Sequence, residues 1–219
     1  MSTTNETKQF SSLDELRDAR RGYVTQAQQN GFEHGLRTLL ADLYPDNAHF
    51  IYELLQNAED AQASTVHFEL FEDQLHVSHD GKRPFQLEDV EAITGIGQSG
   101  KKDDHTQIGK FGVGFKAVFT YTRNPEIHSS EHSFVIRDLF VPEPIPGSSQ
   151  PGKTLFVFPF DSEDKPASVS FDEITRGLEE LGSSTVLFLN QIATISYETV
   201  AGNSGEITRS DTGNNIIEI

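Results

Sequence analysis

Two segments that stand far apart in the sequence most constrain what this chain folds into. Residues 50–61 read FIYELLQNAEDA, and residues 108–119 read IGKFGVGFKAVF. In a helix, residues three, four and seven positions apart share a face, so Glu53, Asn57 and Asp60 would lie along one edge. The apolar residues of the first segment fall on the neighbouring arc, which is typical of a helix that covers a sheet. We therefore expect a helix that presents two carboxylates and an amide above a sheet.

The residue types on this edge are those that metal-assisted hydrolysis requires. Mg²⁺ keeps several of its waters and takes one or two protein oxygens, so the amide oxygen of Asn57 would be enough beside a triphosphate. Glu53, one helical turn earlier, would then orient and deprotonate the attacking water. A solvated face of an amphipathic helix carries the same residue types, and from this segment alone both interpretations stay open.

A run of glycines in the second segment indicates an anion site. Gly109, Gly112 and Gly114 precede Phe115 and an apolar stretch that we expect to form a buried helix at about 114–122. Glycines let backbone amides turn toward an anion, and a helix N-terminus adds partial positive charge, so we expect phosphates there. The spacing G-x-x-G-x-G follows a polar loop and differs from the dinucleotide-binding pattern G-x-G-x-x-G.

Taken together, the order E-x-x-x-N-x-x-D-A at 53–61 and the string GIGQSGKKDDHTQIGKFGVGF at 95–115 resemble the GHKL, or Bergerat-fold, ATPase superfamily. That superfamily includes the ninety-kilodalton heat-shock chaperones, type II topoisomerases, mismatch-repair ATPases and sensor histidine kinases. The strings here are most similar to the chaperone and sacsin-like branch, and the matching motifs span about residues 45–160. The resemblance implies an α+β fold, a two-layer α/β sandwich of Bergerat type with a mixed, mostly antiparallel sheet.

The resemblance also implies roles for individual residues. Glu53 would be the general base and Asn57 the Mg²⁺ ligand. Residues 99–104 would form the tip of a mobile lid over ATP, and Thr154 would lie near adenine. The residues that the resemblance assigns to nucleotide binding are Asn57, Asp60, Ala61, His79, Asp80, Gly81, Ser99, Gly100, Lys101, Gly109, Lys110, Phe111, Gly112, Val113, Gly114, Phe115 and Thr154.

One motif departs from the family pattern. Members of the superfamily usually have D-x-G after the second strand, and the aspartate receives the adenine amino group. This chain has His79 at that place, followed by Asp80 and Gly81. Either the turn is shifted by one residue and Asp80 reads adenine, or His79 does so, and the base preference stays open. The same residues, with Pro84 after them, are also typical of an ordinary tight turn.

A second phosphate-binding pattern competes with the first. Residues 147–154 read GSSQPGKT and satisfy the P-loop pattern G-x-x-x-x-G-K-[ST]. A P-loop works between a strand and a helix, because the helix N-terminus holds the phosphates. Upstream, VPEPIP contains three prolines, and downstream LFVFPF is a strand-like run with a proline, so neither flank fits. We therefore expect Thr154 to open a strand and the P-loop match to have no function.

Composition narrows the set of partners. At 219 residues the chain is long enough for one compact domain, and its net charge of −17 argues against binding to a nucleic-acid backbone. The chain contains no cysteine, which excludes disulfides and thiolate metal sites. No apolar run is long enough for a membrane span, and the N-terminus lacks the apolar core of a signal peptide. We expect a cytoplasmic protein without a membrane partner.

Hydrophobic periodicity and turn signals predict the order of the elements. We expect a helix from Ser11 or Ser12 toward Gln29, a second helix at about 32–43, and a motif helix opened by Pro45 and Asp46. The helices should lie on one face of the sheet. The strands and further helix that the pattern predicts are a hairpin at 66–70 and 75–77, strands near 133–140, 154–159, 185–190 and 193–200, and a helix near 171–181.

We expect residues 1–200 to form the ATP-binding domain, with N-terminal helices at 1–45 and the lid at 94–110. Residues 201–219 would be a linker or strand leading to a missing C-terminal region. The predicted function is Mg²⁺-dependent ATP binding and slow hydrolysis, in which lid closure drives conformational change in the C-terminal domains of a longer chain. A nucleotide-dependent homodimer is a further expectation.

The alternative function is a nucleotide-sensing module that binds ATP or ADP without hydrolysis and acts as a docking switch. Glu53 favours the hydrolase, because a sensor has no need of a general base. Chaperone-like remodelling and prokaryotic defence both fit the resemblance as roles of the larger protein.

Overall fold

An eight-stranded mixed sheet forms the centre of the computed structural model, which describes residues 10–30, 48–95, 114–130, 132–147, 151–187, 189–211 and 217–218. The strand order is β5-β4-β3-β6-β2-β1-β7-β8, and every neighbouring pair is antiparallel except β1 and β7, which are parallel. The strands of this sheet are β1 (Thr65–Leu70), β2 (Gln74–His79), β3 (Glu126–Ser129), β4 (His132–Arg137), β5 (Val141–Pro144), β6 (Thr154–Pro159), β7 (Thr194–Thr199) and β8 (Ser204–Thr208). A separate short ribbon pairs β9 (Ser210–Asp211) with β10 (Ile217–Glu218).

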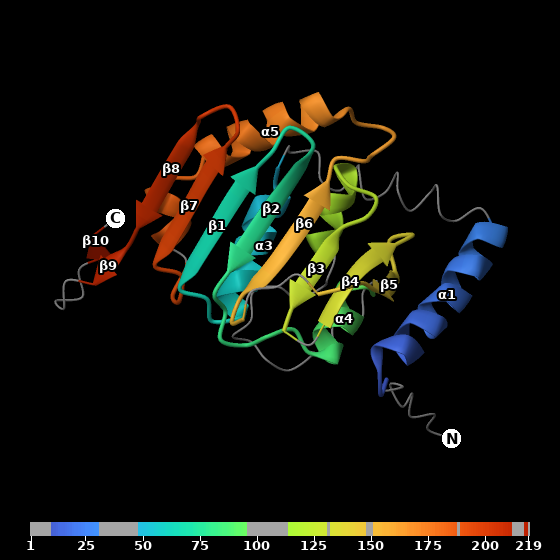
Figure 1. Cartoon of the computed structure of the whole chain (residues 1–219). Coiled ribbons are helices and arrows are strands. Elements are labelled where there is room, and N and C mark those ends of the chain that lie inside the picture. The colour runs from blue at the N-terminus through green and yellow to red at the C-terminus, as the bar shows by residue number, and fades with distance from the viewer. Residues whose placement is uncertain are drawn as a thin grey trace, which may run out of the picture.

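Helices cover one face of this sheet. In Figure 1, α3, α4 and α5 lie behind the strands, and α1 lies beside β5 at the edge of the sheet. The described helices are α1 (Leu13–Gln29), α3 (Phe50–Asp60), α4 (Leu87–Ile93), the 3₁₀ helix η1 (Gly114–Thr120), α5 (Ala167–Glu179) and α6 (Ser183–Leu187). The predicted α+β class, with a mixed, mostly antiparallel sheet in a two-layer α/β sandwich, is confirmed.

The core lies between the sheet and α3. Alternate residues of β1, β2 and β6 are buried, as the period of two along a strand requires. The buried residues of α3 are spaced three and four apart and pack onto that face; they are Phe50, Ile51, Leu54, Leu55 and Ala58. Burial of one such side chain stabilises the fold by roughly 1.5–3 kcal/mol relative to exposure.

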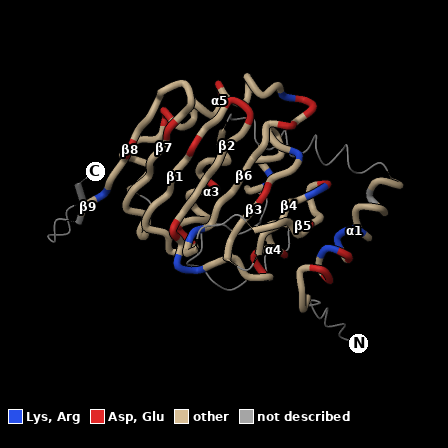
Figure 2. The backbone as a smooth tube through the Cα atoms, in the orientation of Figure 1, with Lys and Arg blue, Asp and Glu red and all other residues tan. Residues whose placement is uncertain are grey.

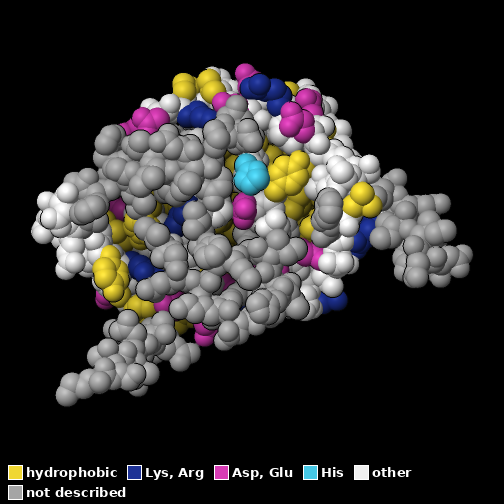
Figure 3. Space-filling view, turned by 180° about the vertical axis from the view of Figure 1, so that it is seen from behind, with side chains coloured by type: hydrophobic (Ala, Val, Ile, Leu, Met, Phe, Trp, Pro, Cys, Tyr) yellow, Lys and Arg dark blue, Asp and Glu magenta, His cyan; other side chains and the backbone are white. Residues whose placement is uncertain are grey.

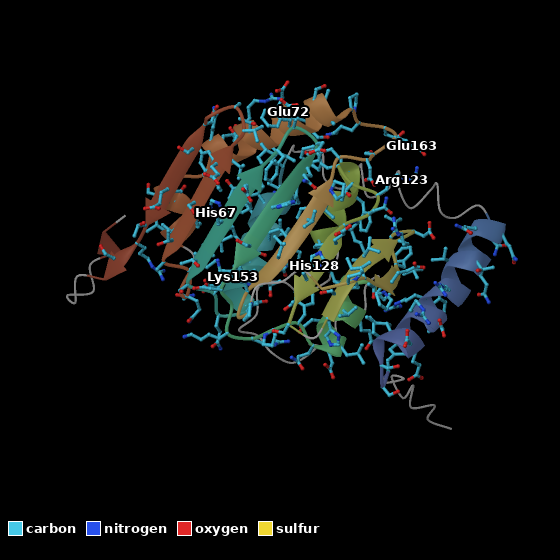
Figure 4. The ribbon with its side chains drawn as sticks, in the orientation of Figure 1. His67, Glu72, Arg123, His128, Lys153 and Glu163 are labelled. Carbon is cyan, nitrogen blue, oxygen red and sulfur yellow. The ribbon has the colours of Figure 1, made fainter. Side chains whose placement is uncertain are left out.

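The other face of the sheet is polar. His67 of β1 and His128 of β3 lie on the side that faces the viewer in Figure 4. His67 Nδ1 lies 2.9 Å from Ser196 Oγ of β7, and His128 Nε2 lies 3.3 Å from Glu126 Oε2. A sheet with one covered face and one polar face is what the alternating segments predicted.

Several predicted elements are confirmed with small changes in their bounds. Helix α1 begins at Leu13, and Ser12 Oγ accepts a hydrogen bond from the Glu15 amide at 3.2 Å, as expected for a capping serine. The motif helix α3 begins at Phe50, several residues after Pro45 and Asp46, because residues 48–49 form a turn in which Ala48 has a positive φ. The second helix expected at 32–43 lies outside the described residues.

The strand expected at 185–190 is wrong. Residues Ser183–Leu187 form α6, and Val186 and Leu189, three positions apart, are buried while Leu187 is 57% exposed. That spacing belongs to a helical turn. A short apolar run such as VLFL does not distinguish a strand from a helix by its periodicity.

The P-loop interpretation can be tested directly. Thr154 is the first residue of β6, so the element after the glycine-rich stretch is a strand and not a helix. Lys153, labelled in Figure 4, is exposed at the start of that strand. The prediction that neither flank suits a P-loop is confirmed for the downstream flank.

Charge is spread over the molecule. Asp and Glu lie on most of the elements, and three arginines, Arg17, Arg20 and Arg21, lie along α1 (Figure 2). At the end of the molecule near α5, the Arg123 guanidinium forms an ion pair with Glu163, and both are labelled in Figure 4. No described helix is both long and apolar enough to cross a membrane.

Candidate functional site

The first contact of the candidate site joins α3 to the start of η1. Gly114, the first residue of η1, lies so close to Glu53 that a Cβ added at Gly114 would be 2.0 Å from Glu53 Oε2 and 2.1 Å from Cδ. Such distances are impossible for a real side chain, so the close approach requires glycine at this position. The end of the glycine-rich segment therefore meets the carboxylate that the sequence predicts as the base.

The Glu53 carboxylate is well placed to act on something other than the protein. Glu53 is half-buried, and within the described part of the chain its side chain has no hydrogen bond and no ion pair. Helix α3, which carries Glu53, covers the face of the sheet that is turned to the back in Figure 1. Figure 3 shows the molecule from that side, and hydrophobic side chains there lie next to a histidine and an acidic side chain. A carboxylate held near backbone and without a partner among the described residues is a candidate to bind a water or a ligand.

The second contact joins the end of α3 to the turn after β2. Asn57 is half-buried, and its carbonyl accepts the backbone N–H of Ala61 at 3.0 Å, which ends the helix. A Cβ added at Gly81 would be 2.8 Å from both Ala61 Cβ and His79 Nδ1. Ala61, the last residue of the E-x-x-x-N-x-x-D-A motif, therefore touches the turn formed by His79, Asp80 and Gly81, called here the H-D-G turn. Asp60, the last residue of α3, is also half-buried.

His79 is a buried, neutral imidazole. Its side chain is 4% exposed, and burial lowers the pKa of His79 to about 4. The Gly81 amide donates a hydrogen bond to His79 Nδ1 at 3.1 Å. The ring lies 6.1 Å from that of Phe156 on the neighbouring strand β6.

Asp80 has a structural role at the start of β1. Its Oδ1 accepts hydrogen bonds from the amides of Ser64 and Thr65, both at 2.8 Å, and its Oδ2 accepts one from the Ser64 hydroxyl at 2.6 Å. Partial burial raises the pKa of Asp80, but these hydrogen bonds outweigh it and lower the pKa to about 2. The carboxylate is directed at the backbone of the preceding hairpin strand.

Three buried polar side chains form a row across neighbouring strands. His79 of β2 is opposite Thr154 of β6, and Thr154 is opposite Ser129 of β3. Thr154 is 2% and Ser129 1% exposed, and Ser129 Oγ lies 2.8 Å from Thr154 Oγ1. Residues opposite each other in antiparallel strands have Cβ atoms about 4.5–5.5 Å apart, so the three side chains are neighbours.

The sequence analysis missed Ser129, because β3 was not predicted. Ser129 Oγ also accepts the Phe85 amide at 3.1 Å, which ties the segment after the H-D-G turn to the same row. The signal that could have found it is the register of β3 against β6, and register is set by pairing between strands and not by the local sequence.

Lys116 was also missed. It is 2% exposed, and its ammonium donates hydrogen bonds to the carbonyls of Ile93 at 2.8 Å and Leu139 at 2.5 Å. Burial, and secondarily the charge of Arg20, lowers the pKa of Lys116 to about 7. Ile93 ends α4 and Lys116 lies in η1, so this side chain joins the two elements that flank the predicted lid.

The structure brings some of the predicted site residues together. Glu53 and Gly114 are brought together, and so are Ala61, His79 and Gly81, with Thr154 opposite His79. Phe115 is buried against Phe156 and Phe158 in the core, with ring centroids 6.3 and 6.2 Å away. The predicted residues that lie outside the described part of the chain are Ser99, Gly100, Lys101, Gly109, Lys110, Phe111, Gly112 and Val113.

The described side chains offer few ligands for a metal ion. No group of three or more His, Asp or Glu side chains that could hold a metal ion is found among the described residues. Asn57 offers a single amide oxygen. That donor set suits Mg²⁺ held mainly by the phosphates of a substrate and by water, with one protein oxygen.

Fold and site together define a two-layer α/β sandwich with a line of motif residues along the edge of one helix. Residues 79–143 match the model of a family described as "Sacsin domain". The chain is 35% identical to human sacsin over 106 residues, which are 40% of this chain and 2% of that protein. It is 28% identical over 225 residues to Protein NO VEIN of Arabidopsis thaliana, covering 90% of this chain and 8% of that protein. These matches support a sacsin-like family.

Solved structures show a related fold. One is described as the crystal structure of the N-terminal domain of a DNA repair protein, with a TM-score of 0.54 and 12% sequence identity. The match covers 78% of this chain and 54% of that one. At this identity the similarity concerns the fold alone. The chain spans less than a tenth of the two curated relatives it matches.

Proposed function

We propose that this domain binds ATP with Mg²⁺ and hydrolyses it slowly. The observation that carries the proposal is the contact between Gly114 and the Glu53 carboxylate, because it joins a predicted phosphate loop to a predicted base.

The length of α3 matches an elongated ligand. Glu53 contacts Gly114 near one end of the helix, and Ala61 contacts Gly81 and His79 at the other end. Eight residues at 1.5 Å per residue separate Glu53 from Ala61, or about 12 Å along the axis. In the proposed complex the terminal phosphate lies near Gly114, and the base lies near His79 and Thr154.

The proposed chemistry uses few protein groups. Glu53 accepts a proton from a water, whose oxygen attacks the γ-phosphorus as the bond to the bridging oxygen breaks, so that inorganic phosphate and a nucleoside diphosphate leave. The amide oxygen of Asn57 would hold the Mg²⁺, which would neutralise phosphate charge. Hydrolysis by the isolated domain is slow in this proposal, because lid closure or contacts from further domains limit it.

A calorimetric titration tests the binding step. Mg²⁺ complexes of ATP and GTP are titrated into wild type, Asn57→Ala and Lys153→Ala. We expect the heat of binding to be lost only in Asn57→Ala, since Lys153 directly precedes a strand and holds no phosphate in this proposal. Loss only in Lys153→Ala would transfer the site to residues 147–154, and no heat in wild type would refute nucleotide binding.

Replacing the base separates the two candidate functions. Glu53→Ala should keep the affinity for nucleotide and lower the hydrolysis rate at least about 100-fold, the usual contribution of a general base. Malachite-green detection of released phosphate measures that rate. If wild type and Glu53→Ala bind equally and both release no phosphate, the domain is the nucleotide-sensing module and not a hydrolase.

The role of the domain in a larger protein is part of the same proposal. We propose that closure of a lid at 94–110 over the nucleotide moves attached C-terminal domains and favours a homodimer. The support is the sacsin-like similarity and the small fraction of each curated relative that this chain spans.

A further inference from the structure

We infer that the hydroxyl of Tyr121 sets the position of the Glu53 carboxylate against Gly114, which makes Tyr121 a positioning residue for hydrolysis. In the proposed function, on which this inference rests, Glu53 is the general base. Tyr121 belongs to neither sequence motif and directly follows η1. Its hydroxyl reaches Ala48, which lies 73 positions away in the chain and two residues before α3.

Helix α3 begins without a side-chain cap. His49 occupies the N-cap position, and its side chain makes no capping hydrogen bond. The Ala48 carbonyl accepts the amide of Ile51 at 3.0 Å, and Ala48 has a φ of 65°, in the left-handed region that residues other than glycine rarely adopt. A residue persists in that region only where its surroundings hold it there. The direction in which α3 starts therefore depends on the contacts of Ala48.

The hydroxyl of Tyr121 holds the backbone of Ala48. The Ala48 amide donates to Tyr121 Oη at 2.9 Å, and both residues are buried. Tyr121 Oη in turn donates to Glu173 Oε2 of α5 at 3.1 Å. A buried backbone amide that loses its acceptor is unfavourable, so this hydrogen bond favours the left-handed conformation of Ala48.

Tyr121 is itself held on several sides. Its amide donates to the Val118 carbonyl of η1 at 2.9 Å, which ties Tyr121 to that helix. Its ring centroid lies 5.1 Å from that of Phe50, the first residue of α3. Lys165 Nζ lies 4.4 Å from the centroid of the same ring and forms an ion pair with Glu173. Tyr121 therefore connects the end of η1 to the first turn of α3.

Helix α5 closes the other side of this contact. A Cβ added at Gly177 of α5 would lie 2.5 Å from Ala48 Cβ and 3.1 Å from Ile51 Cδ1. The close approach requires glycine at this position. The start of α3 is thus held between α5 and the Tyr121 hydroxyl.

This arrangement bears directly on the candidate site. Glu53 lies in the first turn of α3, and Gly114 is the first residue of η1. Tyr121 joins the same two helices at the opposite end of η1. A shift in the first turn of α3 would move the Glu53 carboxylate away from Gly114, and a misplacement of about 1 Å can cost on the order of 10²-fold in rate.

The first test removes the hydroxyl alone. Tyr121→Phe deletes one oxygen and keeps the ring beside Phe50 and Lys165. Thr122→Val is the matched control, because Thr122 is the next residue, is fully buried, and donates to Asp161 Oδ1 at 3.2 Å without involving α3. In phosphate-release assays with Mg²⁺-ATP on the 219-residue chain, Tyr121→Phe should lower kcat at least about tenfold and keep KM within about twofold. Thr122→Val should keep both.

The second test needs no nucleotide. Without the Tyr121 hydroxyl, α3 can yield to a methyl group at Gly114. Gly114→Ala should therefore lower the urea midpoint of unfolding less in the Tyr121→Phe background than in wild type. In the Thr122→Val background, Gly114→Ala should lower the midpoint as much as it does in wild type.

The outcomes separate this inference from the function on which it rests. A kcat of Tyr121→Phe equal to that of Thr122→Val, or additive losses of Tyr121→Phe and Gly114→Ala in urea, would overturn the positioning role. Wild type that neither binds ATP nor releases phosphate would refute the proposed function, whereas coupling in urea would still show that the hydroxyl sets the contact between Glu53 and Gly114. If Tyr121→Phe does not fold, as judged by circular dichroism, Gly177→Ala displaces Ala48 from the side of α5 and should lower kcat with KM unchanged.

Discussion

At the scale of single residues, the hydrogen bonds of Asp80 stabilise the fold and make the free energy of unfolding depend on pH. Its folded pKa of about 2 lies below the usual 3.8, so it stabilises the fold above pH 4 and loses that contribution as the pH falls toward 2. Asp80→Asn should lower the free energy of unfolding at pH 7 by about 1 kcal/mol, because two amides of the β1 start lose a charged acceptor and the site is partly screened by solvent.

Urea unfolding followed by circular dichroism at several pH values from 2 to 7 measures this effect. The two proteins should differ most above pH 4 and converge near pH 2. A constant difference over the whole range would show that the hydrogen bonds of Asp80 do not depend on its charge.

Lys116 gives a pH dependence of the same direction in a higher pH window, although here it is the charged form that destabilises the fold. A lysine whose pKa falls from 10.5 to about 7 on folding binds more protons in the unfolded chain, so stability rises with pH between 7 and 10.5. In Lys116→Met this rise should be absent, a difference of up to about 1.4 kcal/mol per pH unit. Unfolding curves of both proteins at pH 7, 8, 9 and 10 test it, and parallel curves for the two proteins would contradict it.

At the scale of elements, the contact between α3 and η1 is the most demanding feature of the fold. A methyl group at Gly114 would overlap the Glu53 carboxylate, so Gly114→Ala must move η1, Glu53 or both. We expect Gly114→Ala to lose roughly 1–3 kcal/mol of unfolding free energy and at least about tenfold in any hydrolysis rate. In Gly182→Ala, where nothing lies within 4 Å of the added Cβ, neither quantity should change appreciably.

A double-mutant cycle makes this prediction independent of activity. In a Glu53→Ala background the clash partner is gone, so Gly114→Ala should cost clearly less than it does in wild type. Equal costs in the two backgrounds would mean that Glu53 and Gly114 do not touch.

The helices and strands also show how much of the fold can be predicted from the sequence. The periodicity of residues 50–61 predicts α3 almost to its last residue, because its buried stripe and its polar edge are both encoded locally. The α4 helix was missed, although Gln86 and Asp89 form the reciprocal hydrogen bonds of a capping box. Strands β3 and β5 were missed because they are short, and prolines interrupt β5.

In the candidate site, too, some residues could be predicted from the local sequence and others could not. Glu53, Asn57, Gly114 and Thr154 were predicted because each belongs to a motif that is continuous in sequence. Ser129 joins the site only through strand register, and the Asp80 carboxylate is held by Ser64, 16 residues away from it. Local sequence does not encode which of two neighbouring side chains turns into the core when a distant backbone competes for one of them.

At the scale of the whole molecule, net charge leads to a last prediction that similarity of fold alone would not give. One structural neighbour comes from a DNA repair protein, but this chain carries a net charge of −17, and acidic residues lie on most of its elements (Figure 2). Nonspecific DNA affinity arises from counterion release by clustered Lys and Arg, and a strongly acidic surface repels the phosphate backbone.

We therefore expect no binding of a fluorescein-labelled 20-base-pair duplex in 50 mM salt, with a dissociation constant weaker than about 10⁻⁴ M, the weak limit of nonspecific binding at physiological salt. Fluorescence anisotropy measures this, and low salt is the stringent condition because it strengthens any electrostatic attraction. Micromolar binding that weakens steeply between 50 and 200 mM salt would mean that a local basic surface outweighs the net charge. In that case Arg17→Glu and Arg21→Glu on α1, where several cations lie, would be the first variants to abolish it.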